Sequence, residues 1–154
     1  LADSCEQAYK LVARQFNVPI EENVFVGKLP VLMFERRSDF VRFSSEHDES
    51  PMGALAAGYY VGRDDGLGHM AMWKPRPEPG NTGKAAQAAA ERDWAQTLVH
   101  EFVHAFVARY RTNQRIPRWL NEGLAEYIEQ DFLPDQNYHE WTRVYAQQDV
   151  DISP

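Results

Sequence analysis

The stretch His100-Glu101-Phe102-Val103-His104 is the part of the chain from which its fold and chemistry are best inferred. Residues four apart lie on one face of a helix, so His100 and His104 can point at the same spot. Two imidazoles placed in this way supply two of the three protein ligands of a catalytic zinc site. Glu101 flanks that spot without needing to bind the metal, and a carboxylate there can accept a proton from activated water.

The residues around this stretch predict the helix that it requires. Residues 94–110 contain neither Gly nor Pro. Two rows of residues at helical spacing form a buried face: Leu98, Phe102, Ala105 and Arg109, and beside them Val99, Val103, Phe106 and Tyr110. The two histidines lie at the border of this face. The alternative is a pair of histidines that hydrogen-bond within a helical core, because a motif match alone is only a hypothesis.

A second stretch, Trp119-Leu120-Asn121-Glu122-Gly123-Leu124-Ala125-Glu126-Tyr127, supplies a candidate third ligand. Pro117 suits the first turn of a helix, so we expect a helix to open here with Glu122 in its first turn. A short loop makes two helices neighbours, and Glu122 can then face the histidines. Two His and one carboxylate are typical of catalytic zinc, whereas structural zinc more often recruits Cys. The sequence, with Cys5 as its one cysteine, therefore predicts one catalytic Zn²⁺ per chain.

The two stretches together resemble the gluzincin clan of zinc metallopeptidases. The second is similar to the third-ligand segment of the clan's aminopeptidases and to the bacterial peptidase MA-like domains, and the resemblance covers about residues 94–130. Seventeen residues separate His104 from Glu122. This spacing is tighter than in the aminopeptidase and thermolysin-like branches, which favours the small-domain branch.

This resemblance implies an α+β, zincin-like fold. We expect a small twisted mixed β-sheet packed on the helix of the two histidines, followed by a short helical C-terminal subdomain. The implied activity is zinc-dependent hydrolysis of peptide bonds with Glu101 as the general base. The alternative is a catalytically inactive or latent zincin-fold module that binds or scaffolds a partner, because fold alone is silent on activity.

The resemblance also implies roles for residues outside the two histidines and Glu122. Thermolysin-like relatives place a carboxylate at the spacing of Glu126 against the first histidine, so we expect Glu126 to hold His100; the alternative is a solvent-exposed Glu126. Related enzymes use a Tyr or His downstream of the third ligand to donate a proton. Tyr138 and His139 are the candidates here, with a core tyrosine and a surface histidine as the alternative.

Residues 55–73 predict a β-hairpin, with strands at 57–61 and 69–73 joined by turn-forming residues. In the resembling families the strand before the metal helix binds the substrate through its free edge. The expected edge is therefore the second strand, in particular His69, Met70, Ala71 and Met72. The alternative is the ordinary alternation of a hairpin. Ala71 stands where the aminopeptidases hold the substrate's amine with a Glu, which favours an endopeptidase.

The remaining sequence predicts one domain over residues 1–154. Residues 1–110 would form the sheet and the helix of the two histidines, and residues 111–154 the helix of Glu122 and a closing helix. Three further elements are expected from the apolar spacing: a helix over 3–16, a strand over 31–34 and a short helix that begins at Ser38. The closing helix would carry Tyr138, Trp141, Val144 and Tyr145 at helical spacing.

The composition, 44% hydrophobic with a net charge of −7, is that of a soluble globular protein. The negative charge argues against non-specific nucleic-acid binding and favours a basic or neutral peptide or protein substrate. No apolar run reaches the length of a membrane helix and no signal peptide is present. The chain begins at Leu1, so we expect a processed or excised form, secreted or periplasmic, although the single cysteine leaves the compartment open. The oligomeric state is also open.

Overall fold

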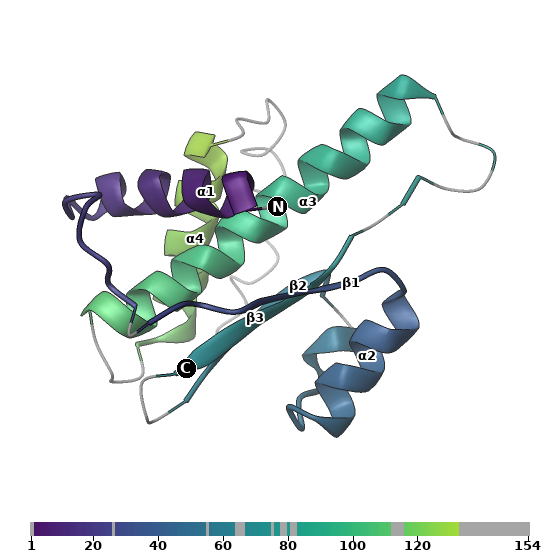
Figure 1. Cartoon of the computed structure of the whole chain (residues 1–154), viewed down its shortest axis with the longest axis horizontal. Helices are drawn as coiled ribbons and strands as arrows, with labels where there is room; N and C mark the ends of the chain where they lie inside the picture. Colours follow the sequence, from purple (N-terminus) through teal and green to yellow (C-terminus); the bar gives the residue numbers. More distant parts are fainter. Residues whose placement is uncertain are drawn as a thin grey trace, which may run out of the picture.

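The protein is described by a computed structural model that covers residues 2–25, 27–54, 56–63, 67–74, 76–77, 80, 83–111 and 116–132. It combines helices with a small mixed sheet, which confirms the predicted α+β class (Figure 1). The elements in chain order are α1 (Ala2–Gln15), β1 (Val31–Phe34), α2 (Arg37–Glu46), the 3-10 turn η1 (Pro51–Ala54), β2 (Gly58–Gly62), β3 (Gly68–Trp73), α3 (Lys84–Phe106), the π-helical turn η2 (Val107–Arg111) and α4 (Arg118–Phe132).

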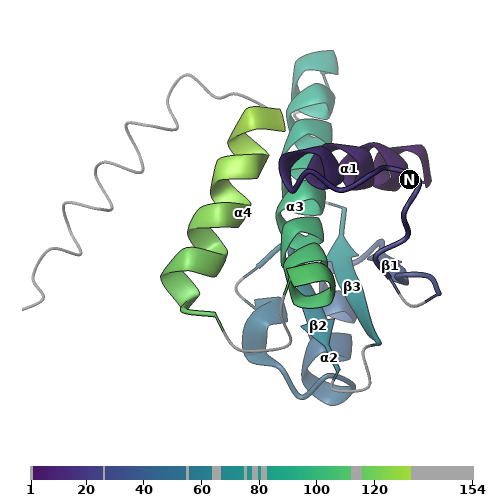
Figure 2. The ribbon, with the colours of Figure 1, turned by 90° about the vertical axis from the view of Figure 1, so that its left-hand side faces the viewer.

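The sheet separates two apolar clusters because successive side chains of a strand point to opposite faces. Met70 and Met72 of β3 belong to the larger cluster with the buried face of α3. Ala71, between them, packs with Phe40 of α2 and Tyr59 of β2. Figures 1 and 2 show α3 crossing one face of the sheet and α2 lying against the other, while α1 and α4 pack on α3.

The long helix α3 runs through the centre of the molecule and begins ten residues before the predicted start at residue 94. The alanine-rich residues 85–90 extend it, because alanine has the highest helix propensity. Its buried residues gather in the C-terminal half, from Leu98 to Phe106. The predicted buried face is therefore confirmed from Leu98 to Phe106, and the two histidines lie beside it, whereas Tyr110 in the following π-helical turn is exposed. Among the described residues, no helix has the length and apolar character needed to cross a membrane.

The strand order is β1-β3-β2, with β1 parallel and β2 antiparallel to β3. The predicted hairpin and the strand over 31–34 are confirmed. The prediction that His69, Met70, Ala71 and Met72 form a free edge is wrong, because β1 pairs with β3 from Val31–Met70 to Phe34–Trp73. Among the described strands, the edge nearest α3 belongs to β2. Ala71 faces α2, so its identity carries no information about how a substrate amine is held.

A buried carboxylate ties α2 to the hairpin on the sheet face away from α3. The Asp48 side chain is only 4% exposed. Its Oδ1 accepts a hydrogen bond from His47 Nδ1 at 2.9 Å, and its Oδ2 accepts from Tyr59 OH at 2.7 Å and His69 Nε2 at 2.9 Å. Burial alone would raise the pKa of Asp48, but these hydrogen bonds outweigh it and hold the pKa below its ordinary value. His69 therefore has a structural partner.

The predicted closing helix lies outside the described residues, as do Tyr138 and His139.

We expect Asp48→Asn to lower the free energy of unfolding by about 1–3 kcal/mol near neutral pH, because Tyr59 and His69 lose a charged acceptor. Denaturant unfolding measures this, with Glu46→Gln on the exposed end of α2 as the matched control. Since the folded pKa of Asp48 is depressed, its contribution is present above the ordinary value of 3.8 and is lost as the pH falls through the folded value. Equal stabilities of the two variants near pH 7 would contradict this role.

Candidate metal centre

Three potential ligand atoms converge between α3 and α4. Glu122 Oε2 lies 3.4 Å from His100 Nε2 and 3.6 Å from His104 Nε2. One ligand atom from each residue lies within 4.8 Å of the others. The two imidazole rings stand nearly perpendicular, at 82°, with centroids 4.8 Å apart. Among the described residues this is the group of His, Cys, Asp and Glu side chains that could hold a metal ion, and it is the trio that the sequence predicted.

The local sequence explains why Glu122 faces the two histidines. Pro117 precedes α4, and its carbonyl accepts hydrogen bonds from the amides of Leu120 and Asn121 at 3.0 and 3.1 Å. The helix therefore begins at once after the loop, and Glu122 lies just beyond its first turn. Ala125 and Ile128 are buried in the same cluster as α3, which fixes the face that α4 turns toward the histidines.

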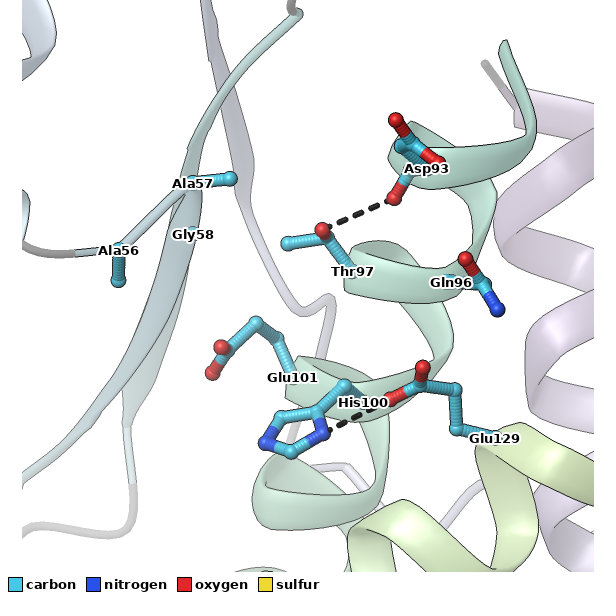
Figure 3. Close-up of a pocket in the computed structure, with 9 residues that line it drawn as sticks. All are labelled: Ala56, Ala57, Gly58, Asp93, Gln96, Thr97, His100, Glu101 and Glu129. Carbon is cyan, nitrogen blue, oxygen red and sulfur yellow. Dashed lines mark hydrogen bonds and ion pairs between the residues drawn. The ribbon is translucent and has the colours of Figure 1, made fainter. Parts of the chain in front are cut away.

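The carboxylate that holds His100 belongs to Glu129. His100 Nδ1 donates to Glu129 Oε2 at 3.1 Å, as the dashed line in Figure 3 shows. The prediction that Glu126 makes this contact is wrong. Seven residues are almost two turns, so Glu129 lies about 20° from Glu122 around α4, whereas four residues displace Glu126 by about 40°. The spacing of seven from Glu122 is the sequence signal that could have identified Glu129.

The two histidines have different electrostatic surroundings. Burial disfavours the charged form of His100, but the hydrogen bond to Glu129 and the nearby carboxylates outweigh it and raise its pKa. Burial, together with the neighbouring His100, lowers the pKa of His104. His104 Nδ1 is buried and has no hydrogen-bond partner among the described residues. A neutral His104 can therefore offer the lone pair of Nε2 to a cation that lies between the two rings.

Glu101 lies beside the three converging residues and points toward β2 (Figure 3). It is only 9% exposed, and burial raises its pKa to about 7, with Glu122 and Glu129 adding to the rise and His100 opposing it. A carboxyl group with a pKa near 7 can both accept and release a proton at neutral pH. The structure thus brings Glu101 to the two histidines and Glu122, as the sequence predicted.

An open cavity of about 360 Å³ adjoins Glu101 and His100. Small residues at the start of β2 form one wall and the turns of α3 before His100 form the other (Figure 3). The full lining is Ala56, Ala57, Gly58, Asp93, Gln96, Thr97, His100, Glu101 and Glu129. The cavity is therefore large enough for a side chain or a short peptide segment directly beside the convergent trio.

The first residue of β2, Gly58, and the two residues before it lie along this cavity. Trp73 N donates to Ala57 O at 3.1 Å and Arg63 N donates to Leu67 O at 2.7 Å, so the odd-numbered residues of β2 pair with β3. Antiparallel alternation then directs the backbone groups of Gly58 and Tyr60 away from β3. The apolar pattern of the sequence does not show that β1 pairs with β3, and for this reason the edge predicted at β3 lies at β2.

Comparison with known protein families, curated proteins and solved structures found no match to this chain.

We expect Gly58→Ala to lower the free energy of unfolding by about 1–3 kcal/mol, the usual cost of overpacking. A Cβ at Gly58 would lie 2.9 Å from Thr97 Cγ2 and 3.3 Å from Glu101 Cγ, so β2 and α3 must separate. Gly123→Ala is the matched control, since nothing lies within 4 Å of its Cβ position and alanine is favoured in a helix. An unchanged unfolding midpoint for Gly58→Ala would contradict the close approach.

Proposed function

We propose that this chain is a zinc-dependent peptidase with a zincin-like fold of the gluzincin type, and that it cleaves within peptide or protein chains. The observation that carries the proposal is the convergence of His100, His104 and Glu122 beside the buried carboxyl of Glu101. Two imidazole nitrogens and one carboxylate oxygen are the protein ligands of catalytic zinc, which keeps a further position open.

The ligand set fits such an ion. Glu129 engages Nδ1 of His100 and leaves Nε2 for the metal, an arrangement typical of metal-bound histidines. The carboxylates of Glu101, Glu122 and Glu129 concentrate negative charge that a divalent cation would offset. When bound, zinc supplies Lewis-acid chemistry: it polarises a carbonyl and lowers the pKa of water toward neutrality.

The residues of the chain supply proton transfer, orientation of a ligand and substrate binding. Glu101 accepts the proton of the attacking water and delivers it to the nitrogen of the leaving amine, which requires a carboxyl that gives and takes protons near neutral pH. Glu129 fixes the ring orientation of His100. The free edge of β2 receives the substrate as an extended strand through the backbone groups of Gly58 and the carbonyl of Tyr60, because the Tyr60 amide donates to Glu101.

We expect the purified protein to hold about one zinc ion per chain, because one set of three ligands is found among the described residues. Elemental analysis after exhaustive dialysis measures the content. His100→Ala and His104→Ala should each lose tight binding, whereas His47→Ala, which changes an exposed histidine on α2's C-terminal side, should retain it. Stoichiometric zinc in a His100→Ala, His104→Ala double variant would rule out this site.

Glu101→Gln should retain zinc while losing hydrolysis by roughly 10²–10⁴-fold, since the general base contributes to proton transfer and not to ligation. Quenched-fluorescent peptides or casein serve as substrates, and zinc content is measured on the same samples. A Gln variant as active as the wild type would show that another group is the base.

Glu129→Gln should weaken zinc affinity by roughly 10–100-fold, the range for residues that hold a metal-bound histidine. Glu126→Gln is the matched comparison, because it removes the same charge from the same helix. Competitive chelator titration gives both affinities. If Glu126→Gln weakens binding more than Glu129→Gln does, the hydrogen bond to His100 is not the interaction that matters.

A further inference from the structure

The cavity beside Glu101 has a charge pattern that the metal ligands do not explain. Its lining includes the carboxylates of Asp93, Glu101 and Glu129 and contains neither Lys nor Arg. Two of these carboxylates already have a role in the candidate metal centre. Glu129 accepts a hydrogen bond from His100, and Glu101, which is nine-tenths buried, is the proposed general base. Asp93 has no role in the candidate metal centre. Its carboxylate forms no ion pair with any described residue, although its backbone carbonyl accepts a hydrogen bond from Thr97 at 3.0 Å.

The position of Asp93 along α3 sets the length of the group that could reach it. Asp93 lies seven residues before His100, which corresponds to about 10 Å along the helix axis. Figure 3 shows it at the far end of the cavity from His100, beyond Thr97. The opposite wall consists of Ala56, Ala57 and Gly58, whose small side chains leave the space beside α3 open. A long, unbranched substituent can therefore extend from a residue held near His100 toward Asp93.

We propose that this cavity binds a positively charged nitrogen of the substrate and that Asp93 pairs with it. In a peptide that is cleaved internally, a Lys or Arg side chain next to the scissile bond carries such a nitrogen. A free amino terminus also carries one, and its recognition would place the cleavage near the end of the chain. The length of the cavity and the negative charge of the lining suit both. The inference rests on the proposed peptidase function, since it places the scissile bond near His100, and it adds to that function a preference for cationic substrates.

Matched peptides test the preference. The first pair is blocked at both ends and carries either Lys or norleucine next to the scissile bond; the second pair is neutral in its side chains and has either a free or an acetylated amino terminus. We expect kcat/KM to favour the charged member of at least one pair by roughly two- to fivefold, the effect of an ion pair that stays partly in water. Which pair shows the preference identifies the source of the nitrogen.

Two variants of α3 separate Asp93 from the overall charge. Asp93→Asn and Glu91→Gln each remove one carboxylate from the same part of the helix, but Glu91 is exposed, is bonded to Gln87 and does not line the cavity. Asp93→Asn should abolish the preference mainly through KM, because the ion pair forms equally with the bound substrate and in the transition state. Glu91→Gln should retain it, and Asp93→Lys should reverse it toward a Glu-containing peptide.

A binding measurement keeps this test separate from that of catalysis. The zinc-loaded Glu101→Gln protein is titrated with the same peptides at low and high salt, with and without Asp93→Asn. Tighter binding of the charged peptides that weakens with salt and with Asp93→Asn supports the inference. Equal binding of charged and neutral peptides would overturn the inference while leaving the peptidase proposal intact. A preference that is retained in both Asp93→Asn and Glu91→Gln, or lost in both, would do the same. If no peptide is hydrolysed by the wild type, the proposed function fails, and the binding result alone decides whether Asp93 recognises cations.

Discussion

The candidate site depends on how α4 packs against α3. The histidines and the glutamate come from different helices, so their ligand atoms converge only while the apolar contact between these helices holds. Ala125, fully buried, lets α4 approach closely, and Ile128 adds a buried side chain worth about 1.5–3 kcal/mol. The same contact brings Glu122 and Glu129 near Glu101, and this mutual repulsion adds to the burial that raises the pKa of Glu101. A bound cation would relieve the repulsion and link the helices, so metal binding and folding would reinforce each other.

The sheet contributes the other wall of the site through one close approach. β2 can lie against α3 beside Glu101 because Gly58 has no side chain. Since, among the described strands, β2 pairs with β3 on one side only, its outward backbone groups point toward α3: the amide of Tyr60 donates to Glu101, and Gly58 lines the cavity beside it. Glu101, the start of β2 and the acidic cavity therefore lie side by side, which is the arrangement that the proposed peptidase function needs. On the opposite face Asp48 anchors the hairpin to α2, which keeps this edge in place.

The parts of the structure that follow from local periodicity could be predicted from the sequence. The spacing of Leu98, Phe102 and their neighbours determines the buried face of α3, and the pair at 100 and 104 then falls on one side of it. Proline 117 signals the start of α4 and so the placement of Glu122. These inferences need only the geometry of a helix, which is determined by the sequence of the segment that forms it.

The predictions that are wrong concern contacts between segments that lie far apart in the sequence. No local pattern shows that β1 pairs with β3, so the free edge was assigned to the wrong strand of a correctly predicted hairpin. Glu126 and Glu129 lie on nearly the same side of α4, and the rotation of the helix about its own axis decides which one reaches His100. That rotation is set by the burial of Ala125 and Ile128 against α3. The sequence does not indicate a role for Asp93, because only the cavity that it lines distinguishes it from other exposed aspartates.

The measurement that tests the central claim most directly is anomalous diffraction at the zinc edge from crystals of the zinc-loaded protein. The account predicts one strong peak per chain between α3 and α4, about 2.0–2.2 Å from the Nε2 atoms of His100 and His104 and from a carboxylate oxygen of Glu122. A peak at another group of residues, or zinc-loaded crystals without a peak between these helices, would contradict it.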